Sequence, residues 1–255
     1  MIKVLSIAGS DPSSGAGIQS DLKTFQALHA FGMVLPAALT IQNSLGVFAA
    51  KGVASGILSK QLDTLLSDIK PNAVKTGMLL TKQNVEAVAK AIKKFSVKGL
   101  VVDPVLKSSS GKPLLQPAAI TSLIVKLFPL AMIVTPNIPE AEVLAGMPIS
   151  SKADMNDAAR RILARGPAYV LIKGGHRTGP AMDTLYGNKT VISFSTSRKK
   201  GAFHGTGCVL ASAITVFIAR GLSVEKSVEK AKLFVDKMLK TAEPLGRSTV
   251  KYFQF

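Results

Sequence analysis

Short runs of apolar residues alternate with stretches of helical periodicity along most of the chain. Several of these runs are continuous, which is typical of strands that are covered on both faces of a sheet. The predicted strands are residues 3–8, 34–41, 73–76, 100–103, 132–135 and 169–173. Strands that alternate with helices form a mostly parallel sheet with crossover connections. The pattern therefore predicts an α/β fold in which helices flank a mostly parallel central sheet.

The predicted helices carry apolar residues at spacings of three and four, which place those residues on one helical face. The stripes are Ile18, Leu22, Phe25 and Leu28; Leu62, Leu65, Leu66 and Ile69; and Val224, Val228, Ala231, Val235 and Met238. Ser223 precedes the last stripe and is a residue type that caps helices. Two later β runs, 183–186 and 190–194, are joined by the turn signal Gly187-Asn188. The segment 48–58 is expected to add an edge strand or a dimer contact.

The length of 255 residues fits one domain, and no repeat or linker divides the chain. We therefore expect a single domain over residues 1–255. Cys208 is the only cysteine, which excludes an intramolecular disulfide and favours a reducing compartment. The apolar stretch 209–219 is shorter than the roughly 20 residues that a membrane helix needs, and residues 4–8 are too few for a signal-peptide core. These features predict a cytoplasmic protein with no membrane partner.

The formal net charge of +17 raises the possibility of a nucleic-acid partner. However, the lysines and arginines are scattered along the predicted helices, and the densest group, Arg198-Lys199-Lys200, has no aromatic residues between its charges. Single-stranded nucleic acids are usually bound by basic grooves that also carry stacking aromatics. We therefore expect no nucleic-acid partner, and we interpret the charge as a solvated basic surface that favours anionic substrates.

Glycine-rich and polar segments follow several predicted strands, where open α/β sheets bind ligands. The first of them, residues 8–17, precedes a helix whose N-terminal N–H groups can meet an anion. It matches neither the dinucleotide motif GxGxxG nor the P-loop motif GxxxxGKS/T. A tight structural turn and a ligand-binding loop both fit this segment.

The resemblance to a known family rests on several segments of the chain. Their order and their spread from Gly9 to Cys208 resemble the hydroxymethylpyrimidine/phosphomethylpyrimidine kinases, which belong to the ribokinase-like superfamily. The segments are Gly9-Ser10-Asp11-Pro12, Gly15-Ala16-Gly17-Ile18-Gln19, Asp21-Leu22-Lys23-Thr24, Leu39-Thr40-Ile41-Gln42-Asn43, Lys75-Thr76-Gly77-Met78-Leu79, Asp103-Pro104-Val105, Thr135-Pro136-Asn137-Ile138-Pro139-Glu140-Ala141, Lys173-Gly174-Gly175-His176 and His204-Gly205-Thr206-Gly207-Cys208. Each segment alone is a weak signal, but together they are specific.

The resemblance implies a ribokinase-like three-layer α/β sandwich. It also implies transfer of the γ-phosphoryl group of ATP to 4-amino-5-hydroxymethyl-2-methylpyrimidine and then to its monophosphate, in thiamine biosynthesis. ATP and Mg²⁺ are the implied cofactors, and a homodimer is the implied assembly. Pyridoxal kinases share most of these motifs, but the pair Gln42-Asn43 is not expected in them, so the pyrimidine is the favoured substrate.

The strongest chemical signal is the segment Gly205, Thr206, Gly207 and Cys208, which precedes the apolar helical run 209–218. Glycines at a helix start expose successive N–H groups toward one point, which suits the charge of a phosphoryl group in transfer. The resemblance implies that this is the anion hole, with Cys208 in the place where many relatives carry an aspartate base. A lone cysteine is usually inert, but a thiol at a helix N-terminus can have a lowered pKa. We therefore expect Cys208 to act as the general base.

Asn137 and Glu140 lie three residues apart, so one helical turn would bring their oxygens together, as Mg²⁺ prefers. The alternative is a helix start in which Asn137 caps and Glu140 favours the dipole. Lys173 is either a phosphate-binding charge or a solvated loop lysine. The resemblance favours the functional role in each case: Asn137 and Glu140 place Mg²⁺-ATP, Asp103 contributes to the metal through water, and Lys173 and Thr206 contact phosphate.

The resemblance places substrate recognition on Gln42, Asp21, Gly9, Met78 and Val105. The Gln42 amide both donates and accepts, which matches the edge of an aminopyrimidine, and Asp21 would accept from the substrate. Met78 and Val105 would be apolar walls, although core packing is the usual fate of such residues.

Two segments depart from the family pattern, namely 105–112, with its two lysines, and Ala202-Phe203 before His204. They leave the first phosphorylation better supported than the second. His29 and His176 show no metal-ligand spacing, and we expect no structural metal. A binding protein on the same scaffold remains the alternative to an enzyme.

Overall fold

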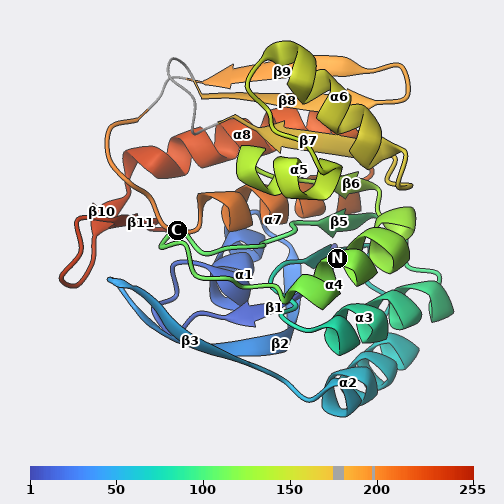
Figure 1. The fold of residues 1–255 in the computed structure, drawn as a ribbon. Coiled ribbons are helices and arrows are strands. Elements are labelled where there is room, and N and C mark those ends of the chain that lie inside the picture. Colours follow the sequence, from blue (N-terminus) through green and yellow to red (C-terminus); the bar gives the residue numbers. More distant parts are fainter. Residues whose placement is uncertain (175–180, 197–198) are drawn as a thin grey trace.

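The computed structural model describes residues 1–174, 181–196 and 199–255. Its centre is a nine-stranded sheet in the order β3-β2-β1-β4-β5-β6-β7-β8-β9 (Figure 1). The six strands from β2 to β7 in this order are parallel, and β3, β8 and β9 run antiparallel to their neighbours. The strands are β1 Lys3–Ser10, β2 Phe31–Asn43, β3 Gly46–Gly52, β4 Ala73–Thr76, β5 Leu100–Val102, β6 Ile133–Val134, β7 Tyr169–Lys173, β8 Ala181–Gly187 and β9 Val191–Thr196.

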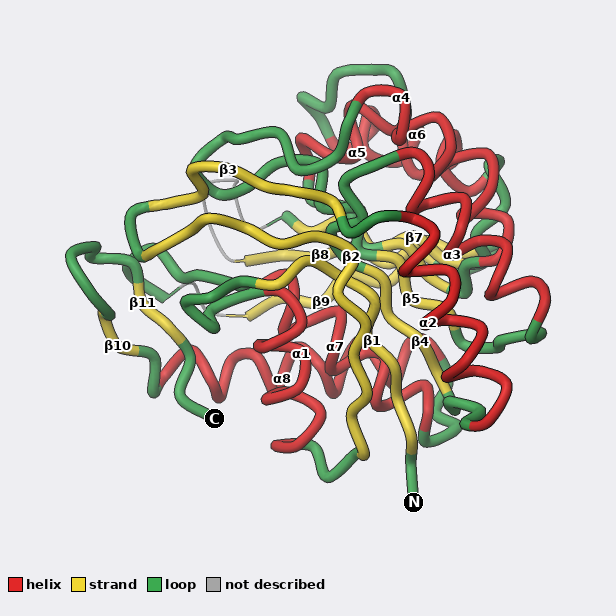
Figure 2. The backbone as a smooth tube through the Cα atoms, turned by 90° about the horizontal axis from the view of Figure 1, so that it is seen from below, coloured by secondary structure: helices red, strands yellow, loops and turns green. Residues whose placement is uncertain are grey.

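Helices cover both faces of the sheet, so the fold has the three predicted layers. One face carries α1, α7 and α8, and the other carries α2 to α6, as the view from below shows (Figure 2). The helices are α1 Gly17–Ala27, α2 Ser55–Asp68, α3 Lys82–Lys94, α4 Pro117–Ser122, α5 Ile138–Ala145, α6 Lys152–Leu163, α7 Thr206–Ala219 and α8 Val224–Lys240. A π-helical turn, Leu123–Leu127, and a 3₁₀ turn, Phe128–Leu130, extend α4.

Each strand of the sheet centre contributes to two hydrophobic cores, because successive side chains point to opposite faces. In β5, Leu100 and Val102 pack into the core under α2 to α6, whereas Val101 packs into the core under α7 and α8. Helix α7 is buried on all sides from Val209 to Ile218. This arrangement explains why the strands appear in the sequence as continuous apolar runs.

The structure confirms the strand alternation and most helix faces predicted from the sequence. All five residues of the α8 stripe are buried, and the hydroxyl of Ser223 accepts a hydrogen bond from the Lys226 amide as its N-cap. The hairpin of β8 and β9 turns at Gly187. Of the segment 48–58, residues 48–52 lie in an edge strand, β3, and residues 55–58 begin α2. His176 and Arg198, which carried two of the predictions, lie outside the described residues.

The predicted apolar face of α1 is confirmed only in part, since Phe25 is buried and Leu28 packs against the core, but Leu22 does not. Leu22 is 36% exposed, and the buried residues of this helix are Ser20, Asp21, Thr24 and Phe25. Three of these four are polar, and two have their polar atoms satisfied inside the protein, since Asp21 pairs with Lys75 and the Thr24 hydroxyl donates to the Ser20 carbonyl. The spacing of three to four between apolar residues therefore identified only part of the packed face of this helix.

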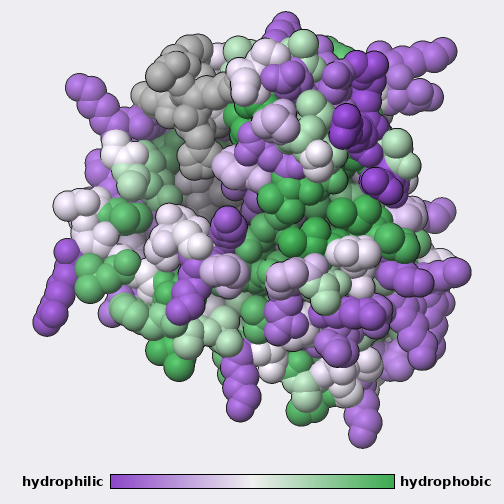
Figure 3. Space-filling view, viewed as in Figure 1, coloured by the Kyte–Doolittle hydropathy of each residue, from purple (hydrophilic) through white to green (hydrophobic). Residues whose placement is uncertain are grey.

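Hydrophilic side chains project from several sides of the face seen in Figure 3 rather than along one stripe. An apolar area lies over α5 and the segment that follows α4, where Val143 and Val125 are about half exposed. Within the described residues, no helix is both long enough and apolar enough to span a membrane.

The C-terminal segment lies beside the loops that precede α1 and α7. Its two short strands, β10 Glu243–Pro244 and β11 Lys251–Tyr252, pair with each other. Strand β11 is also tied to the loop before α7, because the His204 amide donates to the Lys251 carbonyl and the Lys251 amide donates to the Ala202 carbonyl. The last residues of the chain therefore help to shape the loop that begins α7.

Candidate active site

The residues expected to carry function gather at the carboxyl end of the parallel strands. Gly9 lies near the end of β1, Gln42 near the end of β2, and Lys173 at the end of β7, while Met78 and Asp103 directly follow β4 and β5. Because these strands are parallel neighbours, their ends meet along one edge of the sheet. The N-termini of α1 and α7 reach the same edge, since Gly205 touches the loop that begins α1.

The loop that starts α7 depends on glycine at position 205. Gly205 caps the helix in the left-handed conformation, with φ +77°, and a Cβ at this position would lie 1.9 Å from the Gly15 carbonyl oxygen. No side chain caps the helix, so the N–H groups of its first turn have no partner inside the helix. Thr206, Gly207 and Cys208 therefore present a set of backbone donors at the positive end of the helix dipole.

The Cys208 thiol lies at this helix start and is partly buried. Burial raises the pKa of Cys208 to about 11, against the opposing effects of Lys75 and of the Gly17 amide, which bonds the sulfur. The expectation of a lowered pKa is therefore wrong. The helix dipole cannot offset the loss of water around the sulfur together with the nearby carboxylates of Asp103 and Asp21.

Lys173 lies against the first turn of α7. Its ammonium is 2.9 Å from Asp103 Oδ1, and a Cβ on Gly207 would lie 3.1 Å from the Lys173 Nζ atom. The Thr135 hydroxyl donates to the same Asp103 oxygen. Burial lowers the pKa of Lys173, but the carboxylates of Asp103 and Glu140 outweigh that effect, so the pKa lies above its ordinary value. The lysine is thus held charged beside the backbone donors of α7.

Asn137 and Glu140 form a capping box at the start of α5. The Asn137 side chain accepts from the Glu140 amide, and Glu140 Oε2 accepts from the Asn137 amide at 2.9 Å. Glu140 Oε1 accepts from the Leu106 amide, so both oxygens of this carboxylate bind backbone N–H groups. Burial raises the pKa of Glu140, and the nearby Lys173 only partly opposes it. The geometry therefore realises the capping alternative, and it leaves these oxygens poorly placed to act as direct metal ligands.

Asp103 is the carboxylate of this group that pairs with Lys173, and its other oxygen, Oδ2, lies about 3.9 Å from the position of a Cβ on Gly207 at the start of α7. Among the described residues, no cluster of three or more His, Cys, Asp or Glu side chains is arranged to hold a metal ion. A magnesium ion would therefore fit here through water and phosphate oxygens, beside the negative charge of Asp103 and Glu140, rather than in a closed protein cage.

The predicted apolar walls lie together, close to the end of β1. Met78 is 6% exposed and packs with Ala38 and Leu114, with Val105 at the border of this cluster. A Cβ on Gly9 would lie 2.8 Å from the Met78 sulfur, so glycine allows this close approach. Val105 has φ +45°, which is strained for a β-branched residue and is often found at functional sites. Gln42, partly exposed, lies at the end of β2.

Asp21 is fully buried, contrary to the prediction that it binds substrate. Its side chain is 0% exposed, and both oxygens are occupied by Lys75, at 2.8 and 2.9 Å. The hydroxyls of Ser6 and Ser212 also donate to it. Asp21 of α1 is therefore linked by buried hydrogen bonds to β1, β4 and α7.

Two residues of the site were missed as functional candidates. Lys75 is fully buried in β4, and the signals for it were its place in a quoted motif and its charge inside the short strand 73–76. His204 was quoted as part of a motif, but no role was predicted for it. Its Nε2 atom lies 2.9 Å from Asp11 Oδ2 and 3.0 Å from Gln42 Nε2. Its position beside a glycine-rich helix start was the available signal.

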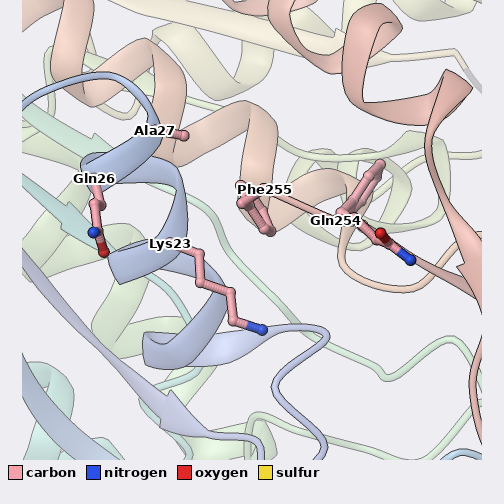
Figure 4. Close-up of a pocket in the computed structure, with 6 residues that line it drawn as sticks. Lys23, Gln26, Ala27, Gln254 and Phe255 are labelled. Atoms are coloured by element: carbon pink, nitrogen blue, oxygen red, sulfur yellow. The ribbon is translucent and has the colours of Figure 1, made fainter.

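An open hollow of about 450 Å³ lies elsewhere, between α1 and the C-terminal segment. Lys23, Gln26 and Ala27 of α1 lie across from Gln254 and Phe255 in Figure 4. The hollow contains none of the residues described above, so its size does not make it the active site.

Comparison with known proteins identifies relatives over nearly the whole chain. The model of the family described as phosphomethylpyrimidine kinase matches residues 11–252. The hydroxymethylpyrimidine/phosphomethylpyrimidine kinase of Rhizobium meliloti is 40% identical over 256 residues, covering 98% of this chain and 96% of the relative. The thiamine biosynthesis bifunctional protein ThiED of Geobacter sulfurreducens is 42% identical over 96% of this chain, which spans 50% of that longer protein.

Two solved structures show the same fold. The phosphomethylpyrimidine kinase of Clostridium difficile 630 is 43% identical with a TM-score of 0.83, covering 93% of this chain and 99% of the other. The Staphylococcus aureus pyridoxal kinase in complex with AMP-PCP and pyridoxal is 35% identical with a TM-score of 0.91, covering 100% of this chain and 93% of the other. The predicted ribokinase-like fold is confirmed, and the chain belongs to the phosphomethylpyrimidine kinase family.

Proposed function

We propose that this protein is an ATP-dependent kinase that phosphorylates 4-amino-5-hydroxymethyl-2-methylpyrimidine and then its monophosphate, in thiamine biosynthesis. The observation that carries the proposal is the start of α7, where unpaired backbone donors lie against the charged Lys173. Phosphoryl transfer depends on positioning and on stabilisation of charge, and this arrangement supplies both. Membership of the phosphomethylpyrimidine kinase family supports the same activity.

In the proposed reaction, the hydroxymethyl oxygen forms a bond to the γ-phosphorus of ATP as the bond to the β–γ bridging oxygen breaks and ADP leaves. The N–H groups of Thr206, Gly207 and Cys208 would hold the equatorial phosphoryl oxygens, and Lys173 would contact the phosphates from the side. Cys208 would accept the hydroxyl proton through its thiolate. Because the Cys208 pKa is about 11, this form is a small fraction at neutral pH, but a base of that strength compensates in part for its scarcity.

Magnesium would reach the site with the phosphates of ATP and would lower the repulsion between their charges. Asp103 would hold it through water, and Glu140 would add negative charge while it keeps its two backbone hydrogen bonds. Asn137 would fix the start of α5, which would in turn place the nucleotide. The bound nucleotide analogue named for the pyridoxal kinase relative supports the use of ATP here.

On the substrate side, the apolar cluster of Met78 and Val105 would cover the faces of the pyrimidine ring, and Gly9 would let backbone approach it. Gln42 would bind the edge that carries the exocyclic amine and a ring nitrogen, because its amide both accepts and donates. Asp21 would act only indirectly, by holding Lys75.

Pyridoxal phosphorylation is the second candidate function, because pyridoxal kinases have TM-scores of 0.90 and 0.91 to this structure at 35% identity. The pyrimidine is favoured, since phosphomethylpyrimidine kinases are the relatives with higher identity, at about 40% over nearly the full chain. The amide of Gln42 matches an aminopyrimidine edge, which pyridoxal does not have.

Identification of products by mass spectrometry tests the proposal. The protein is incubated with Mg²⁺-ATP and the hydroxymethylpyrimidine, and we expect a monophosphate that is later converted to the diphosphate. The monophosphate alone would limit the function to the first step. Product from pyridoxal but not from the pyrimidine would replace the proposal with its alternative, and no product from either would indicate a binding protein.

We also propose that the protein forms a homodimer through the outer side of β2 and β3. Leu39, Ile41 and Phe48 are each more than half exposed there, which is unusual for neighbouring large apolar residues. Ile41→Lys should convert the dimer to a monomer in light-scattering measurements, whereas a wild-type monomer would contradict this assembly. A single domain and a cytoplasmic location stay predictions from the sequence.

A further inference from the structure

The side chain of Gln42 lies between His204 and Thr40, and the hydrogen bonds of these groups constrain one another. One terminal atom of the amide, Nε2, is 3.0 Å from His204 Nε2. The other, Oε1, is 3.2 Å from the Thr40 hydroxyl oxygen. Each neighbour has a second partner that limits what it can offer to the amide.

The second partner of His204 is Asp11. Asp11 Oδ1 accepts from the amide and the hydroxyl of Ser13, and Oδ2 accepts from the Ala16 amide. A carboxylate that accepts this many hydrogen bonds is ionised, so it must also accept from His204, whose Nε2 lies 2.9 Å away. The Nε2 atom of His204 therefore carries a proton and offers no lone pair, so the atom of Gln42 that faces it has to be an acceptor, which shares this N–H with Asp11.

The second partner of Thr40 is the carbonyl oxygen of Ser10, which its hydroxyl reaches at 2.9 Å. The hydroxyl has one proton, and this shorter contact uses it. The side of the hydroxyl that faces Gln42 therefore offers a lone pair and needs a donor. Both constraints are met when the amide oxygen of Gln42 turns to His204 and its NH₂ group turns to Thr40, a half-turn that leaves the two distances unchanged.

We propose that His204 and Thr40 are positioning residues that fix the direction of the Gln42 amide and thereby select the edge of the substrate. The inference rests on the proposed function, since it assigns the amide to the substrate pocket. After both bonds are made, Gln42 keeps one lone pair on the His204 side and one N–H on the Thr40 side. The substrate amine therefore binds on the His204 side, and the ring nitrogen beside it binds on the Thr40 side.

The imidazole of His204 is itself held in place by the C-terminal segment. The Tyr252 ring meets it edge-on at 5.2 Å, and the His204 amide donates to the Lys251 carbonyl. A Cβ on Gly15 would lie 2.2 Å from His204 Cδ2 and 2.5 Å from the Tyr252 ring, so glycine at this position lets both rings pack on the first loop. The orientation of Gln42 thus depends on the first loop, on the loop before α7 and on the C-terminal segment.

The test uses two pyrimidines that differ only in this edge: the 4-amino compound and its 4-oxo analogue, whose ring N–H and carbonyl oxygen reverse the donor and the acceptor. A fixed amide should reject the reversed edge by about 100-fold or more, because polar groups would be left unpaired. Thr40→Val removes the hydroxyl and frees the amide to turn. We expect the preference for the amino compound, in dissociation constants and in kcat/KM, to fall by about 10-fold or more. Thr40→Ser, which keeps the hydroxyl, should retain the preference.

An unchanged preference in Thr40→Val would overturn the inference, as would a loss of preference in Thr40→Ser equal to that in Thr40→Val. Thr40→Ala removes the same hydroxyl if the valine variant does not fold. The dissociation constants, measured by calorimetry, separate this inference from the proposed function. If neither compound is phosphorylated but the binding preference falls in Thr40→Val, then the function is wrong and the inference stands. If the wild-type protein binds neither compound, both are wrong.

Discussion

Two lysine–aspartate pairs lie near the start of α7, and they differ in the exposure of their side chains. Lys75 and Asp21 are 0% exposed, in the middle of β4 and α1, whereas Lys173 is 15% exposed at the end of β7 and Asp103 is 4% exposed. Burial lowers the pKa of Lys75, but the attraction of Asp21 outweighs it and keeps the lysine charged. The hydroxyls of Ser6 and Ser212 complete the surroundings of the first pair, because both donate to Asp21. The second pair lies beside the start of α7, where a phosphate could accept a hydrogen bond from the lysine.

The comparison suggests that the same two residue types serve structure when sealed and function when open. A sealed pair contributes to stability only while both charges are present, because either one alone would be buried without compensation. An open pair can exchange partners with water or with a ligand, so its loss should affect the reaction more than the fold. Cys208 lies near both pairs, and both aspartates help to raise its pKa.

The largest effect is expected from Asp21→Asn. The change leaves the Lys75 charge buried without its partner, so we expect the free energy of unfolding to fall by about 3–5 kcal/mol in urea titrations. The double variant Asp21→Asn with Lys75→Met, which removes both charges, should recover most of that stability and keep substantial kinase activity. Loss of activity in a stable double variant would show that the sealed pair takes part in function after all.

The second effect is expected from Lys173→Met. Removal of the charge beside α7 should lower kcat by about 10²–10³-fold, which is the size found when one donor to a developing anion is lost. Unfolding in urea should change less than in Asp21→Asn, because Asp103 keeps the hydrogen bond from the Thr135 hydroxyl when the lysine is removed. Lys173→Arg is the control that keeps the charge. Full activity in Lys173→Met would remove this lysine from the transfer step.

The third prediction concerns pH and Cys208. Because the Cys208 pKa is raised to about 11, the thiolate fraction should grow about tenfold per pH unit between pH 7 and 10. Alkylation by iodoacetamide should follow that increase. If the thiolate accepts the substrate proton, Cys208→Ala should lower kcat by about 10²–10⁴-fold and should flatten the rise of kcat with pH. A Cys208→Ala variant with the wild-type kcat would exclude the cysteine as the base.

The smallest effect is expected from Asn137→Ala. It removes the N-cap of α5, which should reduce the free energy of unfolding by about 1 kcal/mol. Asn137→Asp, which keeps a capping oxygen, should retain that stability. If the capping box also places the nucleotide, then KM for ATP should rise in the alanine variant while kcat changes little. A fall in kcat as large as in Lys173→Met would instead point to a direct role in transfer.

The fold could be predicted from the sequence where one physical effect dominates. The continuous run 209–218 identified a helix buried on all sides, and the stripe of α8 identified its packed face. The prediction failed in part for α1, because Asp21 is buried through a partner 54 residues away. Hydrophobic spacing reports only on solvent exclusion of apolar groups, so it cannot find a buried face made of paired polar residues.

The site could be predicted to a similar extent. Motif positions identified Lys173, Asp103 and the loop at Gly205, which the structure brings together. The raised pKa of Cys208 could not be predicted, because it depends on burial and on the carboxylates of Asp103 and Asp21, which come from two separate segments. The contact of His204 with Asp11 and Gln42 joins residues 193 and 162 positions apart, and only the folded chain shows it.

The most direct test of the account is the ratio of kcat/KM for the hydroxymethylpyrimidine to that for pyridoxal, measured by coupled ADP release with Mg²⁺-ATP. The account predicts a preference for the pyrimidine of about 100-fold or more, because pyridoxal would leave the fixed amide of Gln42 unpaired. A preference for pyridoxal, or equal turnover of the two compounds, would contradict the account.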